Sequence, residues 1–330
     1  MTTVLRGLEE HDYSRENLAA ALRLSGKDQQ ELFALARRRR DRHFPERTVQ
    51  VRSVIEISNV CRQRCTFCNI GHSSEQSYRI GIDAFLAMAA FLHAQGRRFL
   101  MVQSGESGSQ HFVTHVADCV RELRNRFPDM AVILCLGNLD EPQYRELKEA
   151  GAESYILKFE TSNAELYRKL KPRDTLARRL ACIESLLRVG LQVGSGDIVG
   201  LPGQTHDDLV DDLLLLGKFD LSMQSCSVFI PNERSECRNQ PMGSLDLTLN
   251  VLALMRIMYP RRLMPATSSL EKPRAGGQYL GLMAGANTVT CHDGTPEELK
   301  HLFPIYSIKR FTPQLEHLAQ AVRKAGLSLS

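Results

Sequence analysis

Apolar runs rich in β-branched residues alternate with helical patterns along most of this chain, and this alternation restricts its fold more than any other feature. Parallel strands need a crossover connection, usually a helix, so strands separated by helices form a parallel sheet. Eight such units close into a barrel. We therefore predict an α/β fold, a complete (β/α)8 TIM-type barrel. The expected strands are Val51–Ile57, Phe99–Val102, Ala131–Leu136, Ser154–Phe159, Leu191–Val199, Ser222–Ile230, Leu263–Ala266 and Asn287–Thr290; the helices between them are Asp83–Ala94, His111–Arg126, Pro142–Ala150, Ala177–Val189, His206–Leu216 and Leu245–Met258.

The two ends of the 330-residue chain lie outside this alternation. Between Ser14 and Phe44, leucines recur at helical spacing and predict two helices before the first strand. We expect an N-terminal helical extension at residues 1–48, the barrel at 49–310 and a C-terminal helix at 311–330. The longest expected loop, Pro231–Leu245, follows the sixth strand, at the end of a barrel where active sites lie.

Charge and hydropathy exclude several classes of protein. The net charge of +4 is small and spread along the chain, which predicts no binding to nucleic acid. No apolar run is long enough to cross a bilayer, and the first residues lack a secretory pattern, so we expect neither a membrane protein nor a secreted one. Nine cysteines in such a chain indicate a reducing compartment, with roles in metal binding or catalysis rather than in disulfides. We predict a cytoplasmic location.

Three of these cysteines, Cys61, Cys65 and Cys68, lie in the segment CRQRCTFC directly after the first expected strand. A structural zinc site takes four ligands, usually as two separated pairs, and no second pair lies nearby. A 4Fe–4S cluster held by three cysteines keeps one iron open for another ligand. We interpret the three cysteines as ligands of such a cluster; the competing interpretation is three structural or incidental cysteines.

The spacing C-x3-C-x2-C, with an aromatic Phe67 before the third cysteine, resembles the signature of the radical S-adenosylmethionine (SAM) superfamily. The resemblance implies an enzyme in which SAM binds the open iron and is reductively cleaved to a 5′-deoxyadenosyl radical. The residues implied to bind SAM are Ser104, Gly105 and Glu106 for the methionine ammonium, Glu160 for the ribose or ammonium, Arg179 for the carboxylate and Ile198 for the adenine. Three of these assignments have a competing interpretation: a turn for Ser104–Glu106, a solvated carboxylate at a helix start for Glu160 and an ordinary surface arginine for Arg179.

Four further segments, at residues 160–172, 194–216, 229–232 and 265–269, resemble HydE, a radical SAM branch related to methylornithine synthase and biotin synthase. HydE is a maturase that helps to assemble the di-iron site of FeFe hydrogenase. The resemblance implies a small-molecule substrate, namely an iron-bound cysteine complex that a partner radical enzyme makes. It also implies other hydrogenase maturases as partners. The implied substrate contacts are Lys158, Thr267 and Ser268.

Departures from the HydE pattern keep other functions open. Lys158 stands where HydE has an arginine, and Asn69 and His72 follow the third cysteine where Gly-x-Arg is usual. A HydE paralogue could be an amino-acid mutase like methylornithine synthase, or a sulfur-insertion enzyme like biotin or lipoyl synthase. The six other cysteines form no compact chelate, which disfavours sulfur insertion, although we expect Cys135, Cys226 and Cys291 near strand ends that face the active site.

A non-catalytic iron–sulfur carrier is the rival class of protein, but a carrier has no use for residues that bind SAM. A radical SAM enzyme needs a one-electron donor, for which we expect flavodoxin or ferredoxin. The densest run of positive charge, Arg37–Arg40, is either a solvated helix face or a docking surface for that donor.

Overall fold

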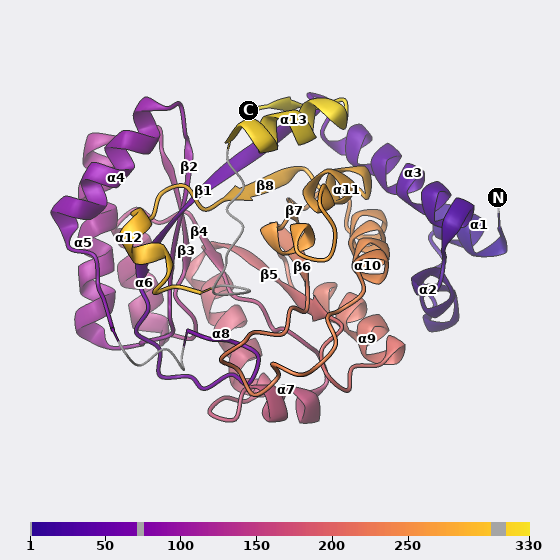
Figure 1. Ribbon diagram of the computed structural model, residues 1–330, viewed down its shortest axis with the longest axis horizontal. Helices are drawn as coiled ribbons and strands as arrows, with labels where there is room; N and C mark the ends of the chain where they lie inside the picture. Colours follow the sequence, from indigo (N-terminus) through magenta and orange to yellow (C-terminus); the bar gives the residue numbers. More distant parts are fainter. Residues whose placement is uncertain (1, 71–75, 305–314) are drawn as a thin grey trace.

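Eight parallel strands form the centre of the computed structural model, which describes residues 2–70, 76–304 and 315–330. Their order in the sheet is β6-β5-β4-β3-β2-β1-β8-β7, and Met223 of β6 pairs with Leu263, just before β7, so the two ends of the sheet meet. The chain therefore folds as the expected TIM-type barrel (Figure 1). The strands are β1 Thr48–Ser58, β2 Phe99–Ser104, β3 Ala131–Cys135, β4 Ser154–Ile156, β5 Gln192–Val199, β6 Met223–Val228, β7 Pro265–Ala266 and β8 Thr288–Cys291.

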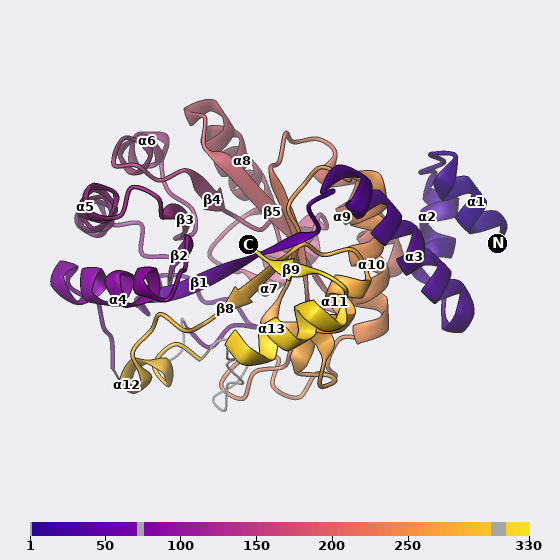
Figure 2. The same cartoon turned by 90° about the horizontal axis from the view of Figure 1, so that it is seen from above.

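Helices surround the barrel on its outside, as Figure 2 shows. The six helices expected between strands are present, with bounds that differ by one residue at most. The sequence analysis missed α7, α11 and α12, whose seven residues or fewer are too few to display a clear helical period. The helices that follow the strands are α4 Ile82–Ala94, α5 Gln110–Arg126, α6 Glu141–Glu149, α7 Ala164–Leu170, α8 Leu176–Val189, α9 His206–Leu216, α10 Leu245–Met258, α11 Gly277–Met283 and α12 Glu297–Lys300, with a 3-10 turn at Ser268–Glu271.

The N-terminal segment forms three helices rather than two: α1 Thr3–Glu9, α2 Arg15–Leu22 and α3 Gly26–His43. The first was missed because it precedes the leucine pattern, although Thr2 caps it by accepting a hydrogen bond from the Leu5 amide. Their apolar residues share one hydrophobic core with the barrel helices. Gln29 donates a hydrogen bond to Asn250 of α10, at 2.9 Å, which holds α3 on the barrel.

The C-terminal segment contains α13 Leu315–Lys324 and a short strand, β9 Ser328–Leu329. Strand β9 pairs with Thr48 and Val49 at the beginning of β1, so it lies at the amino end of the barrel strands. The boundary that we expected between residues 310 and 311 lies outside the described residues. In the part of the chain that the structure describes, no helix is long and apolar enough to cross a membrane.

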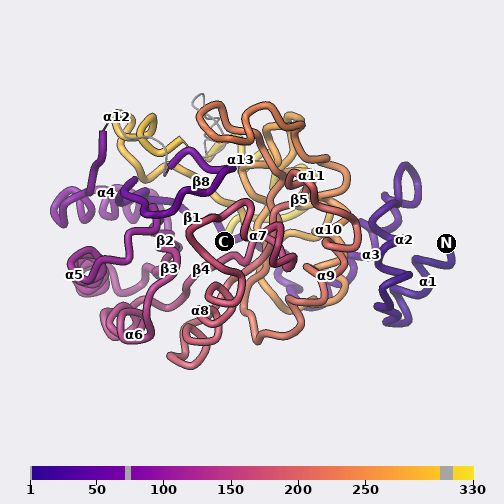
Figure 3. The backbone as a smooth tube through the Cα atoms, turned by 90° about the horizontal axis from the view of Figure 1, so that it is seen from below, coloured from indigo at the N-terminus to yellow at the C-terminus, as the bar shows by residue number. Residues whose placement is uncertain are grey.

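Two loops gather at the opposite end, where the barrel strands finish (Figure 3). Residues 59–70 after β1 carry the three cysteines, and residues 229–244 after β6 contain neither helix nor strand, as expected for the long loop. Backbone hydrogen bonds join them, since the Cys237 amide donates to Thr66 and the Thr66 amide donates to Leu170 at the end of α7. The cysteine loop is thus held between α7 and the long loop.

Candidate active site

A cavity of about 290 Å³ opens at the carboxyl ends of the barrel strands, below the cysteine loop. Residues from six strands or the loops that follow them line it, together with Arg179 of α8. The structure therefore brings together every residue that we expected to bind the cluster or SAM. These lining residues are Cys61, Cys65, Cys68, Ser104, Gly105, Glu106, Glu160, Arg179 and Ile198.

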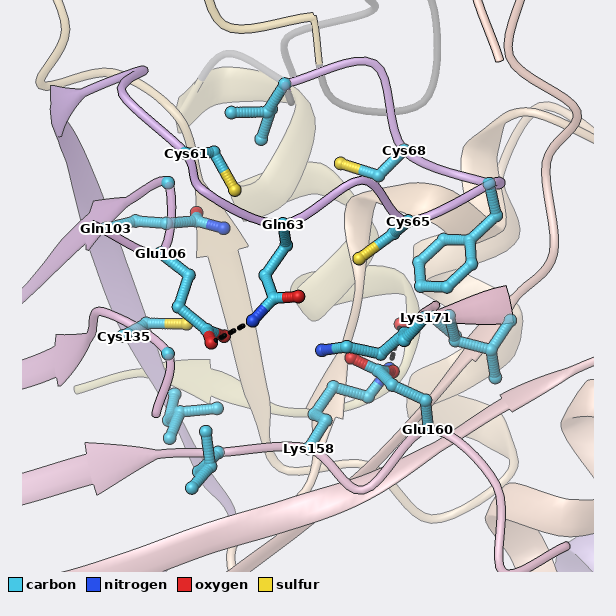
Figure 4. A pocket seen from close by; sticks show the side chains of 18 of the residues that line it. Cys61, Gln63, Cys65, Cys68, Gln103, Glu106, Cys135, Lys158, Glu160 and Lys171 are labelled. Atoms are coloured by element: carbon cyan, nitrogen blue, oxygen red, sulfur yellow. Dashed lines mark hydrogen bonds and ion pairs between the residues drawn. The ribbon is translucent and has the colours of Figure 1, made fainter. Parts of the chain in front are cut away.

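The three cysteines are half-buried, and Figure 4 shows their sulfur atoms around one space at the top of the cavity. All nine cysteines lie in the described residues, and none forms a disulfide. Burial raises the pKa of Cys65 to about 12, so this thiol loses its proton only to a metal or a strong base. In the described residues no three His, Cys, Asp or Glu side chains are close enough to hold one metal ion. Sulfurs set around a space fit a multi-iron cluster, in which each cysteine binds a different iron.

Gly105 fixes the cysteine loop to the end of β2. The Gly105 amide donates a hydrogen bond to Ser58, and the Arg62 amide donates one to Glu106, both at 2.9 Å. A β-carbon on Gly105 would lie 2.6 Å from the Val60 carbonyl oxygen, which is closer than real side chains come. The glycine therefore allows the cysteine loop to approach the end of β2 closely, in addition to the contact with the methionine ammonium that we expected of it.

Glu106 lies in the wall of the cavity with its carboxylate already bonded. Gln63 donates a hydrogen bond to one Glu106 oxygen at 2.6 Å, and Arg179 forms an ion pair with the other at 3.2 Å (Figure 4 shows the first). A β-carbon on Gly137 would lie 2.3 Å from the Glu106 side chain, so this glycine makes room for the carboxylate. The carboxylate is thus oriented by protein groups before any ligand binds.

Arg179 is 3% exposed and does more than face the cavity. Besides Glu106, its guanidinium pairs with Asp174 at 3.3 Å and donates to the Tyr167 hydroxyl at 3.0 Å. Burial lowers the pKa of Arg179, but Tyr167 and Glu106 outweigh this effect and raise it. The sequence suggested a free cation for a cofactor carboxylate; the structure shows an arginine that also holds Glu106 in place.

Glu160 sits in a backbone conformation that is rare for a residue with a side chain, with φ of 67°. Its amide donates to Gly196 and its carbonyl accepts from Ile198, so β5 holds this conformation from both sides. The Glu160 carboxylate lies 3.2 Å from the Lys158 ammonium. Ile198 also lines the cavity and packs against an apolar group that includes Phe229. The pocket is therefore lined by both charged and apolar side chains.

A second cavity of about 120 Å³ lies deeper in the barrel and shares Lys158 with the first. The two hydroxyl residues expected to contact substrate, Thr267 and Ser268, line it. The Ser268 hydroxyl lies 3.4 Å from His292, whose other ring nitrogen lies 3.0 Å from a Glu56 oxygen. The expected substrate contacts thus form a chamber inside the barrel, next to the expected SAM site.

Arg52 is the residue of this inner chamber that the sequence analysis missed most clearly. Its side chain is 4% exposed, and no ion-pair partner lies within reach among the described residues. Its Nε atom donates no hydrogen bond there, and burial lowers the pKa of Arg52 to about 10. Arginine in a strand gives no sequence signal of this kind, because the pattern does not show whether it points into the barrel.

The remaining expectations near the site have mixed outcomes. Asn69 is buried and donates a hydrogen bond to Asn232 of the long loop, so it ties the two loops together. His72 lies outside the described residues. The three cysteines expected near strand ends lie within two residues of them, but only Cys135 lines a cavity; Cys226 donates to the Thr248 carbonyl of α10 instead. Cys291 is fully buried and lines neither cavity.

Comparison with known proteins agrees with this geometry. The model of the radical SAM superfamily matches residues 55–216. HydE, an [FeFe] hydrogenase maturase subunit of Thermotoga maritima, is 35% identical over 92% of this chain and 86% of its own length. The 3-methylornithine synthase of Methanosarcina barkeri is 27% identical over 86% of this chain and 80% of its own length, and the biotin synthase of Cutibacterium acnes is 28% identical over 81% and 76%.

Solved structures show the same fold at low sequence identity. Methylornithine synthase superposes with a TM-score of 0.86 at 21% identity, covering 99% of this chain and 97% of the other. The hydrogenase maturase HydG of Carboxydothermus hydrogenoformans superposes with a TM-score of 0.82 at 17% identity, covering 98% and 77%. The chain therefore belongs to the radical SAM superfamily, in the branch of HydE, methylornithine synthase and biotin synthase, and is an enzyme that uses a 4Fe–4S cluster and SAM.

Proposed function

We propose that this enzyme is a HydE-like maturase that acts in assembly of the di-iron site of FeFe hydrogenase. The observation that supports this proposal most is the 35% identity to HydE of Thermotoga maritima over 92% of the chain. Membership of the family identifies the cofactors but not the substrate. The substrate has to be inferred from the residues inside the barrel.

We propose specific roles for the residues that line the larger cavity. Cys61, Cys65 and Cys68 bind the cluster, which together with SAM supplies one-electron radical chemistry when both are bound. Glu106 accepts hydrogen bonds from the methionine ammonium, since Gln63 and Arg179 already orient its carboxylate. The other expected contacts, which line the same cavity, bind the rest of SAM: Ser104, Gly105, Glu160, Arg179 and Ile198.

We propose that the inner chamber binds the substrate through positive charge and hydroxyl groups. Lys158 lies at the border of the two cavities, and Thr267 and Ser268 line the inner one. Arg52 adds a buried cation without a carboxylate partner among the described residues. Such a lining favours a small anion or a compound with a carboxylate, because an unpaired buried cation gains most from a negative ligand. An iron-bound cysteine complex carries such groups.

A complementation experiment tests this proposal. The gene is expressed in a host that makes FeFe hydrogenase but lacks its own HydE, and hydrogen evolution is measured. We expect hydrogen evolution to return with the wild type and not with the Cys65→Ala variant. Complementation of a biotin-synthase deletion or a methylornithine-synthase deletion instead, with no return of hydrogen evolution, would show that the enzyme is a paralogue with another substrate.

A further inference from the structure

Five exposed cations lie beside the three cysteines, and we call them the rim patch. Two of them stand between the cysteines in the loop after β1, and three stand at the end of α7 and in the turn that follows it. One exposed acid, Glu165, lies at the beginning of the same helix. The rim patch consists of Arg62, Arg64, Arg168, Lys169 and Arg173.

Hydrogen bonds place the two parts of the rim patch next to each other. The Arg173 guanidinium donates to the Arg62 carbonyl at 2.9 Å, and the Thr66 amide donates to the Leu170 carbonyl at 2.9 Å. Figure 3 shows α7 beside the loops on the face where the barrel strands end. The rim patch is therefore a continuous basic surface directly outside the cysteines.

The rim patch is defined by both the grouping and the pairing of its charges. Some exposed arginines elsewhere form ion pairs, such as those with Asp211, Asp118 and Glu141, but others form none with the described residues, such as Arg23 and Arg126. Within residues 2–70, 76–304 and 315–330, none of the five rim cations has a carboxylate within ion-pair distance. The buried Asp174 nearby pairs with Arg179 instead. An uncompensated basic surface attracts an acidic partner and speeds its association.

The run of arginines on α3, the other candidate docking surface, is used by the fold. Arg37 and Arg40 donate to the carbonyls of Met283 and Leu282 in α11, at 2.7 Å each. Arg38 forms an ion pair with Glu9 of α1. This run joins α3 to its neighbours, and it lies away from the cysteines at the side of the barrel (Figure 1).

We propose that the rim patch is the docking surface for a small acidic electron-carrier protein that reduces the cluster. The proposal rests on the family assignment, which requires a one-electron donor, and adds where on this chain the donor binds. Docking there brings the donor against the loop that carries the three cysteines, since Arg62 and Arg64 lie on that loop. The surface charge supplies the attraction, so the association should weaken as salt is added.

A charge-reversal experiment on the loaded enzyme tests the proposal. The double variant Arg168→Glu with Lys169→Glu reverses two rim charges on α7, and it leaves the loop that carries the cysteine ligands unchanged. The matched control, Lys27→Glu with Arg42→Glu, reverses one lysine and one arginine that are exposed on α3. Binding of a purified acidic flavodoxin is measured by calorimetry, and the second-order rate of cluster reduction by its hydroquinone is measured by anaerobic stopped flow.

We expect the rim variant to bind flavodoxin more weakly than wild type does at low salt. Its second-order rate of cluster reduction should be at least about tenfold lower, and the rate of the control variant should change less than about twofold. The difference should shrink as salt is raised. Equal rates for the rim variant and wild type would overturn the proposal, and so would equal slowing of the rim variant and the control. Loss of binding to a single-stranded oligonucleotide without a change in reduction by flavodoxin would also overturn it and assign the patch to nucleic acid.

Dithionite separates this proposal from the chemistry itself. Dithionite needs no protein docking, so the rim variant should cleave SAM with dithionite as the wild type does. The single variant Arg64→Glu, in the other segment of the rim patch, provides an independent second measurement with its iron content checked. A wild type that fails to cleave SAM with dithionite would contradict the chemistry. The docking proposal would then be decided by the calorimetric binding of flavodoxin to the rim variant and to wild type.

Discussion

Asp197 on β5 has a buried carboxylate with no hydrogen-bond partner for either oxygen among the described residues, and it provides the sharpest test of the barrel interior. Three charged groups face it: Lys158 and Glu160, in the segment after the neighbouring strand β4, and Asp212 on α9. Burial raises the pKa of Asp197 from 3.8 to about 7, against the attraction of Lys158. Burial and the nearby Asp197 raise the pKa of Asp212 as well.

The sign of the stability effect follows from these directions. The unfolded chain releases the Asp197 proton near pH 3.8 and the folded chain only near pH 7, so the folded state loses stability as the pH rises between the two values. Linkage puts this loss at roughly 2 kcal/mol at pH 5 and about 4 kcal/mol at pH 8. Asp197→Asn removes the titration, so its free energy of unfolding relative to wild type should increase by about 2–3 kcal/mol from pH 5 to pH 8.

Urea unfolding of the cofactor-free enzyme, followed by circular dichroism at several pH values, measures this change. The control is Asp208→Asn on α9. Burial raises the pKa of Asp208, but hydrogen bonds from the Thr205 amide and Asn163 outweigh it and keep that pKa low. Its variant should therefore lose stability relative to wild type as the pH rises towards about 4, and its relative stability should then stay constant between pH 5 and pH 8. A relative stability of Asp197→Asn that does not change between pH 5 and pH 8 would refute the reasoning.

Two further substitutions probe the cysteine loop and the inner chamber. Gly105→Ala places a β-carbon 2.6 Å from the Val60 carbonyl oxygen, so the loop must move and iron bound after anaerobic reconstitution should fall well below that of wild type. Gly81→Ala, where nothing lies within 4 Å, is the control, and an equal iron content in the two variants would contradict the account. Arg52→Met removes a buried cation without a carboxylate partner in the described chain and should raise the free energy of unfolding by roughly 1–3 kcal/mol, measured by urea unfolding. A loss of stability in Arg52→Met would show that the arginine stabilises the barrel.

The barrel could be predicted because its signal repeats. Each strand pairs with the next, so the alternation of apolar runs and helices fixes the order of the strands without long-range information. Short elements carry no such repeat, and α7 and β9 were therefore missed. The strand β9 also depends on pairing with Thr48, more than two hundred residues earlier in the chain, which no local pattern shows.

The cysteines could be predicted because ligands of one cluster lie close together in the sequence. Gln63, between two of them, was missed because its importance lies in the hydrogen bond to Glu106, and that contact exists only in the fold. Arg52 and Asp197 were missed for a related reason: whether a charged side chain on a strand points into the barrel depends on register and burial. Arg179 was found, but its pairing with Glu106 could not be foreseen.

Cleavage of SAM by the reconstituted enzyme tests the central claim most directly. The wild type and the Cys65→Ala variant are loaded with iron and sulfide without oxygen, reduced with dithionite and mixed with SAM, and 5′-deoxyadenosine is measured by chromatography. We predict about four irons per chain and formation of 5′-deoxyadenosine for the wild type, and loss of both for Cys65→Ala. A wild type that carries four irons per chain and forms no 5′-deoxyadenosine, or a Cys65→Ala variant that forms as much as wild type, would contradict the account.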